Sequence, residues 1–174
     1  MNNIVLVLFN DAIDIFRLQF QTIERFLEPC ILNIVLNEDN PKKLKKHIES
    51  IVINSKHKII YFTKSQILDE YMFEGRGYIS QQLCKLLVPI EKDYVVLDDK
   101  DFFVKTTTYK QLLGFYPTIY QNIHPFFEKF YHLCCKEFNV EVQINEPFTP
   151  RLIKKQAIQK IIAHFENKKV DQNT

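Results

Sequence analysis

Glycine is almost missing from this chain of 174 residues, which contains only Gly75, Gly77 and Gly114. A Walker-type phosphate loop requires two suitably spaced glycines before a Lys-Ser or Lys-Thr pair, and the sequence has no such spacing. A dinucleotide-binding turn requires several clustered glycines, which are also lacking. A phosphorylated ligand would therefore have to be held by side chains or by a metal ion rather than by a glycine-rich backbone.

The chain also lacks an excess of charge of either sign and a long apolar run. Its 23 Lys and Arg residues are nearly balanced by 21 Asp and Glu residues, giving a formal net charge of +2. This balance predicts no nucleic-acid partner and no anionic membrane surface, and we interpret the basic run at residues 42–47 as one solvated helix face. No apolar run approaches the roughly 20 residues that cross a bilayer, which predicts no transmembrane segment.

No Cys-x-x-Cys pair is present among the four cysteines Cys30, Cys84, Cys134 and Cys135. The adjacent Cys134 and Cys135 could form only a strained vicinal disulfide, so reduced thiols are expected. Together with the absence of basic residues at the N-terminus, this favours a cytoplasmic protein. A zinc site at His132, Cys134 and Cys135 is disfavoured because a helix-like segment does not let the three converge on one ion.

Short apolar runs alternate with segments of helical periodicity. We predict buried strands at residues 4–9, 31–36 and 94–97, a further strand at 58–62, and a short strand at 140–142. We predict helices at residues 13–27, 41–50, 79–87, 124–138 and 152–165. The alternation indicates an α/β fold with a mainly parallel sheet flanked by helices. We expect a single domain over residues 1–167, followed by a polar tail at 168–174.

Polar residues follow two of the predicted strands. Asn10 and Asp11 come after the first strand, where we expect a turn and a helix cap. Residues 98–101, with the sequence Asp-Asp-Lys-Asp, come after the fourth strand. Ligands of open α/β sheets bind beyond the carboxyl ends of the strands. Three close carboxylates repel each other, so they favour either a divalent cation or a solvated, inert turn, and the sequence leaves both open.

The helix before this acidic cluster strengthens the functional interpretation. Residues 77–86 read Gly-Tyr-Ile-Ser-Gln-Gln-Leu-Cys-Lys-Leu, and residues 94–98 read Tyr-Val-Val-Leu-Asp. This combination resembles GT-A-type glycosyltransferases, in particular a group of small bacterial nucleotide-sugar transferase-like proteins. The resemblance covers residues 3–104 and rests on the order and spacing of the motifs. It implies a GT-A-like, Rossmann-like fold.

The resemblance also implies a donor site. Asn10 and Asp11 would lie near the nucleoside, Lys85 would face the donor phosphates, and Asp98 would be the first acid of the DxD motif. The implied donor-binding set is Asn10, Asp11, Arg76, Gln82, Lys85, Asp98, Asp99 and Lys100. For Arg76, which stands between two glycines, a loop that closes over a phosphate competes with an ordinary solvated turn.

Lys100 stands where the motif has its second acid. Either Asp98 and Asp101 share a Mn²⁺ or Mg²⁺ ion, or Lys100 supplies positive charge to the diphosphate without a metal.

These implications predict an enzyme that transfers a sugar from a nucleotide-diphospho-sugar to a glycan or another hydroxyl acceptor. The alternative is a non-catalytic GT-A-like module for nucleotide binding or protein interaction, which the short chain and the missing DxD acid favour. A phosphate-transferring enzyme that uses the same carboxylates is a third interpretation. No catalytic base can be assigned from the sequence.

Overall fold

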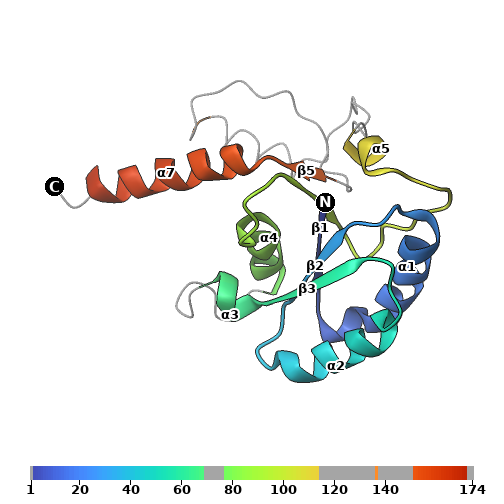
Figure 1. Cartoon of the computed structure of the whole chain (residues 1–174). Helices are drawn as coiled ribbons and strands as arrows, with labels where there is room; N and C mark the ends of the chain where they lie inside the picture. The colour runs from blue at the N-terminus through green and yellow to red at the C-terminus, as the bar shows by residue number, and fades with distance from the viewer. Residues whose placement is uncertain (1, 69–76, 114–135, 137–150, 172–174) are drawn as a thin grey trace.

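A five-stranded sheet forms the centre of the computed structural model, which describes residues 2–68, 77–113, 136 and 151–171 (Figure 1). The strands are β1 (Asn3–Leu8), β2 (Ile31–Leu36), β3 (Lys58–Thr63), β4 (Tyr94–Leu97) and β5 (Arg151–Ile153), in the spatial order β3-β2-β1-β4-β5. The first four are parallel, and β5 runs antiparallel to β4. The predicted α/β fold with a mainly parallel, helix-flanked sheet is confirmed, and the described residues form a single domain.

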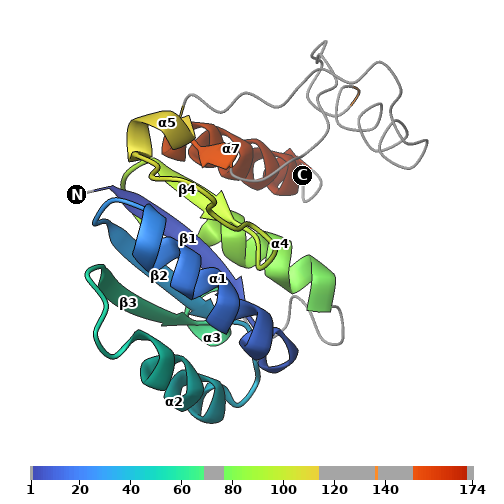
Figure 2. The same ribbon diagram turned by 90° about the vertical axis from the view of Figure 1, so that its right-hand side faces the viewer.

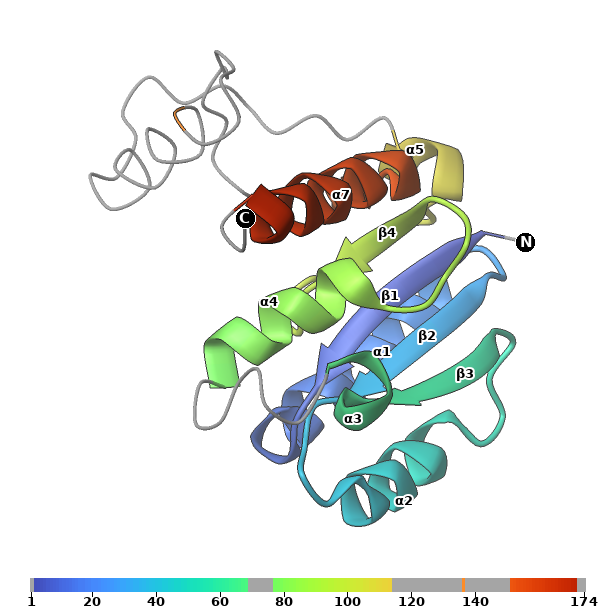
Figure 3. The same ribbon diagram turned by 90° about the vertical axis from the view of Figure 1, so that its left-hand side faces the viewer.

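Helices cover both faces of the sheet (Figures 2 and 3). On one face, α1 (Ile13–Phe26), α2 (Pro41–Val52) and α5 (Tyr109–Leu113) pack on alternate strand residues such as Ile4 and Leu6. On the other face, α3 (Lys64–Ile67) and α4 (Gly77–Leu87) lie over Val5 and Val7. Because both sets of alternating residues are buried, β1 is apolar at consecutive positions. This two-sided burial explains why continuous apolar runs predicted the strands.

The chain changes direction across the sheet at β1. It proceeds from β1 through α1 to β2 on one side, and then to β3. After α3 and α4 it returns to the opposite side of β1, where β4 pairs with it. The carboxyl ends of β1 and β4 therefore form the topological switch point of the sheet, the position where open α/β sheets bind ligands.

The prediction that residue 152 already belongs to the last helix is wrong. Residues 151–153 form β5 and cover the outer edge of β4, whose backbone groups they pair. The last helix, α7 (Lys155–Asp171), starts afterwards, and the backbone N–H of Lys155 donates to Asp93 Oδ1 at 3.0 Å. The Asp93 carboxylate thus caps a helix far along the chain, at the end where the helix dipole favours negative charge.

The structure contains one helix that the sequence analysis lacks, and two predicted segments fall almost entirely outside the described residues. The short helix α3 was not predicted, although Thr63 and Gln66 form the reciprocal hydrogen bonds of a capping box at its start. The predicted helix at 124–138 and strand at 140–142 lie outside the described residues, except for position 136. Within the described ranges, every helix is too short or too polar to cross a lipid bilayer.

Tyr94 connects the sheet to α4. Its side chain is fully buried, and its hydroxyl donates to the carbonyl oxygens of Lys85 at 2.8 Å and Leu86 at 2.9 Å. These carbonyls belong to the last turn of the helix, where no intrahelical N–H is available to them. The hydroxyl therefore fixes the end of α4 against the start of β4.

We predict that Tyr94→Phe lowers the free energy of unfolding by about 1–2 kcal/mol, because two buried carbonyls lose their donor. Tyr61→Phe is the matched control, since the buried Tyr61 hydroxyl has no hydrogen-bond partner among the described residues. The control loses no hydrogen bond with the described residues, so it should not lower the free energy of unfolding. Urea denaturation followed by circular dichroism measures both, and equal effects of the two substitutions would contradict the assigned role of Tyr94.

Candidate functional site

The acidic residues after β4 form a hydrogen-bonded turn. The backbone N–H of Asp101 donates to the carbonyl oxygen of Asp98 at 3.1 Å. In the other direction, the backbone N–H of Asp98 donates to Asp101 Oδ2 at 2.8 Å. One oxygen of the Asp101 carboxylate is thereby used inside the turn, which shapes the loop at the end of the strand.

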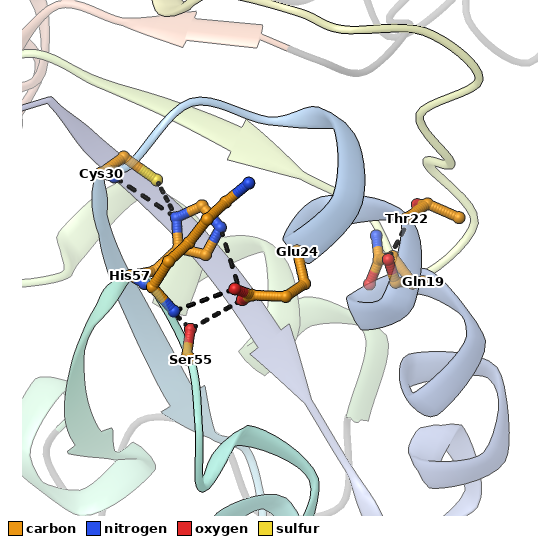
Figure 4. A network of polar contacts seen from close by, with 7 residues as sticks. Gln19, Thr22, Glu24, Cys30, Ser55 and His57 are labelled. Atoms are coloured by element: carbon orange, nitrogen blue, oxygen red, sulfur yellow. Dashed lines mark hydrogen bonds and ion pairs between the residues drawn. The ribbon is translucent and has the colours of Figure 1, made fainter.

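Helix α1 holds this turn from one face of the sheet. Gln19 is completely buried, and its Nε2 donates to the carbonyl oxygens of both Asp98 and Asp101. One turn of helix further on, Thr22 Oγ1 accepts the backbone N–H of Phe103 at 3.1 Å. Figure 4 shows the Gln19 and Thr22 side chains close together on α1. The two side chains fasten the loop to the helix, so the position of Asp98 is set by α1 as well as by β4.

Helix α4 approaches the same aspartate from the opposite face. Lys85 Nζ forms an ion pair and hydrogen bond with Asp98 Oδ1. The Lys85 side chain is only 9% exposed, whereas that of Asp98 is 38% exposed. A nearly buried ammonium requires an opposite charge, and Asp98 supplies it. An ammonium has three N–H donors, and Asp98 is the only hydrogen-bond partner of the Lys85 ammonium among the described residues.

The structure brings some of the predicted donor-site residues together and leaves others apart. Lys85 and Asp98 are in direct contact, Gln82 is half-buried on the same helix, Asp99 is half-buried and Lys100 is exposed. Asn10 and Asp11 lie at the adjacent carboxyl end of β1 and are exposed. Within the described part of the chain, no hydrogen bond or ion pair joins them to Lys85 or Asp98. Arg76 lies outside the described residues.

The predicted helix cap at Asn10 and Asp11 is wrong. These residues form a single turn of 3-10 helix, η1 (Asn10–Ala12), and neither η1 nor α1 has a side-chain cap. The backbone N–H of Asn10 instead donates to Glu38 Oε1 at 2.7 Å. Glu38 follows the neighbouring strand β2, so a carboxylate from another loop provides the acceptor that local capping was expected to provide.

The acidic cluster does not by itself make a complete metal site. In the ranges that the structure describes, no three His, Cys, Asp or Glu side chains are grouped so that they could hold a metal ion. Asp98 and Asp101 each have one carboxylate oxygen in the interactions described above. The prediction that they share Mn²⁺ or Mg²⁺ would therefore need further oxygen ligands from water or from a bound phosphate.

A second polar cluster, which the sequence did not suggest, lies at the amino edge of the sheet (Figure 4). Cys30 Sγ is 3.2 Å from His57 Nδ1, and the backbone N–H of Cys30 also donates to this nitrogen at 3.3 Å. His57 Nε2 lies 3.8 Å from Glu24 Oε2. Ser55 Oγ donates to the same carboxylate at 3.0 Å, and the backbone N–H of Lys56 donates to it at 2.9 Å.

This order of cysteine, histidine and carboxylate resembles a nucleophilic triad. Burial of the cysteine and the histidine, however, makes it a structural contact. Cys30 is fully buried, and burial raises the pKa of its thiol to about 12. Burial also lowers the pKa of His57 below its usual value. His57 Nδ1 accepts the Cys30 backbone N–H, so a proton on Nδ1 would remove this hydrogen bond. Both groups therefore stay neutral, and neither is poised for nucleophilic attack.

One sequence signal could have located the cluster. Cys30 and His57 each stand one residue before a predicted strand, and the register pairs Ile31 with Lys58. Adjacent parallel strands place their starting residues side by side, which brings the two together.

The carboxyl edge is the better candidate for ligand binding because it combines the switch point with a nearly buried ammonium that has spare donors.

Neither the protein-family models nor the curated proteins with which the chain was compared gave a match.

We predict that the free energy of unfolding falls as the pH drops through 6.5, the ordinary pKa of histidine, toward the lower folded-state pKa of His57. In this interval the unfolded chain binds a proton that the folded chain does not accept. The loss is at most about 1.4 kcal/mol per pH unit. Urea denaturation at several pH values measures it.

His57→Gln should flatten this dependence, whereas the control His47→Gln, at an exposed position of α2, should leave it unchanged. The same pH slope in wild type and His57→Gln would contradict the assignment.

Proposed function

We propose that this protein is a glycosyltransferase with a GT-A-like domain that binds a nucleotide-diphospho-sugar at the carboxyl ends of β1 and β4. The acceptor would be a glycan or another hydroxyl compound. The observation that carries the proposal is the Lys85 ammonium, which is nearly buried at the switch point and uses one of its three donors on Asp98. A diphosphate offers oxygen acceptors and negative charge to the two remaining donors.

The proposed reaction needs positive charge where the leaving group departs. The acceptor hydroxyl attacks the anomeric carbon, the bond from that carbon to the diphosphate oxygen breaks, and the hydroxyl proton leaves to solvent or to a base. Negative charge grows on the departing nucleoside diphosphate, and Lys85 would stabilise it. Lys85 is held by Asp98, which in turn is fixed by Gln19, so the charge is positioned before the ligand arrives.

The sequence left open whether a metal or a lysine neutralises the diphosphate. The ion pair with Asp98 favours a lysine, and it favours Lys85 over the exposed Lys100 because the former is held in place. Mn²⁺ or Mg²⁺ at Asp98 and Asp101 stays a prediction, in which the diphosphate itself would supply further ligands.

A non-catalytic nucleotide-binding module is the second candidate. It is favoured by the involvement of Asp98 and Asp101 in contacts that stabilise the turn. The described residues also leave the catalytic base unassigned. The two candidates share the donor site and differ in turnover.

We predict that isothermal titration with UDP- and GDP-sugars detects binding by the wild-type protein. Lys85→Met should weaken it about 10- to 100-fold, which corresponds to the loss of one or two charge-assisted hydrogen bonds. The control Lys92→Met, at an exposed loop position before β4, should bind like wild type. No binding of any nucleotide-sugar, or equal affinities of the two variants, would contradict the proposed site.

The same titrations with added Mn²⁺ separate the two ways of neutralising the diphosphate. If Asp98 and Asp101 hold a metal, Mn²⁺ should strengthen binding and Asp98→Asn should remove this gain. If Lys85 acts without a metal, Mn²⁺ should leave the affinity unchanged.

Turnover distinguishes the enzyme from the module. We expect slow hydrolysis of the bound nucleotide-sugar in the absence of an acceptor, followed as release of the nucleoside diphosphate. Binding without any release would favour the non-catalytic module.

A further inference from the structure

Strand β3 is the outermost strand of the sheet, and its outer edge is unpaired within the described part of the chain. The backbone N–H of Lys58 donates to the carbonyl oxygen of Cys30 beside β2. Backbone groups alternate in direction along a strand, so Ile60 also points toward β2, while Ile59 and Tyr61 point outward. The N–H of Thr63, the next outward residue, is taken by Gln66. The edge therefore presents the donors and acceptors of Ile59 and Tyr61.

Apolar side chains accompany these outward backbone groups. Ile59, Ile60, Tyr61 and Phe62 are all half-buried, in contrast to the fully buried residues of β1 and most of β2. Ile59 and Tyr61 pack on the α1–α2 face, and Phe62 packs on the α3–α4 face. An added strand could therefore bury apolar surface on both faces while pairing with the backbone.

Positive charge lies beside this edge. Lys45 on α2 places its Nζ 5.2 Å from the centre of the Tyr61 ring, so this flank of the helix lies over β3. Lys42 shares this flank because it lies three residues before Lys45, on the same side of the helix. Lys42 and Lys45 are exposed, and Lys58 adds a third exposed cation at the start of the strand. Glu49, paired with Lys45 at 3.8 Å, is the one acid on this flank.

We propose that the outer edge of β3 and the lysine flank of α2 (Lys42 and Lys45) together bind an extended acidic segment of a partner protein. The segment adds to the sheet as a sixth strand next to β3. Its backbone pairs with Ile59 and Tyr61, alternate apolar side chains cover the half-buried edge, and its carboxylates face the lysines. Backbone pairing provides the affinity, and charge selects an acidic segment.

The charge pattern argues against a second copy of this chain as the occupant. Pairing of two β3 edges would bring two lysine flanks together, which like-charge repulsion disfavours. Lysines at edge strands also protect proteins from unwanted strand pairing. Here two of the three cations stand on the neighbouring helix, where they can meet the side chains of an added strand.

The test uses a fluorescein-labelled peptide of alternating Glu and Val with the full-length protein, followed by fluorescence anisotropy. The expected result is saturable binding that weakens as salt is added. A peptide with a central Val→Pro change should lose most of the affinity, because proline removes a backbone donor and disrupts strand pairing. A Lys-Val peptide should not bind.

Lys42→Glu and Lys43→Glu provide a matched pair, because they are adjacent and exposed at the start of α2 but point to different sides of the helix. Lys42→Glu should weaken binding about fivefold or more, and Lys43→Glu less than twofold. Amide hydrogen exchange measured by NMR adds a residue-level readout. Bound peptide should protect the N–H groups of Ile59 and Tyr61 and leave Ile60 unchanged.

Several results would overturn the proposal. These are no binding of the Glu-Val peptide, equal binding of the proline-containing peptide, equal effects of the two lysine variants, or no protection at Ile59 and Tyr61. A dimer that pairs through β3 in solution would also overturn it, since a second copy would then occupy the edge.

Discussion

The nearly buried ammonium of Lys85 constrains the carboxyl edge of the sheet more than any other group. Its charge requires a fixed partner, and Asp98 at the end of β4 provides one. Asp98 in turn belongs to a turn whose carbonyls are held by the buried Gln19 on α1. Helices on opposite faces of the sheet thus converge on one aspartate. This convergence fixes the geometry at the switch point, the position where open α/β sheets bind ligands.

The polar clusters at the two ends of the strands differ in burial and in hydrogen bonding. At the amino ends of the strands, the Cys30 and His57 side chains are buried, and burial keeps the cysteine and histidine neutral. At the carboxyl edge, Asp98 is partly exposed and Lys85 has donors to spare. The first arrangement stabilises the packing of α1 against the starts of β2 and β3, whereas the second is suited to a charged ligand.

The sequence predicted those strands that depend on the composition of their own residues, and it missed features that depend on contacts with distant residues. The apolar runs at β1, β2 and β4 indicated buried strands because both faces of the sheet are covered there, whereas β3, at the outer edge, is only half-buried. The pairing of Lys85 with Asp98 could not be predicted, since it depends on α4 crossing the face opposite α1. β5 was mistaken for helix because its pairing with β4 depends on a distant part of the chain. The cap of Asn10 by Glu38 was missed for the same reason.

A crystal structure of the protein soaked with UDP is the most direct test of whether the Lys85–Asp98 pair marks a nucleotide-diphosphate site. We expect density for UDP beyond the carboxyl ends of β1 and β4, with diphosphate oxygens at hydrogen-bond distance from Lys85 Nζ. Parallel soaks with Mn²⁺ would show whether a metal joins Asp98 to the phosphates. UDP bound at another surface, or no density at a saturating concentration, would contradict the claim.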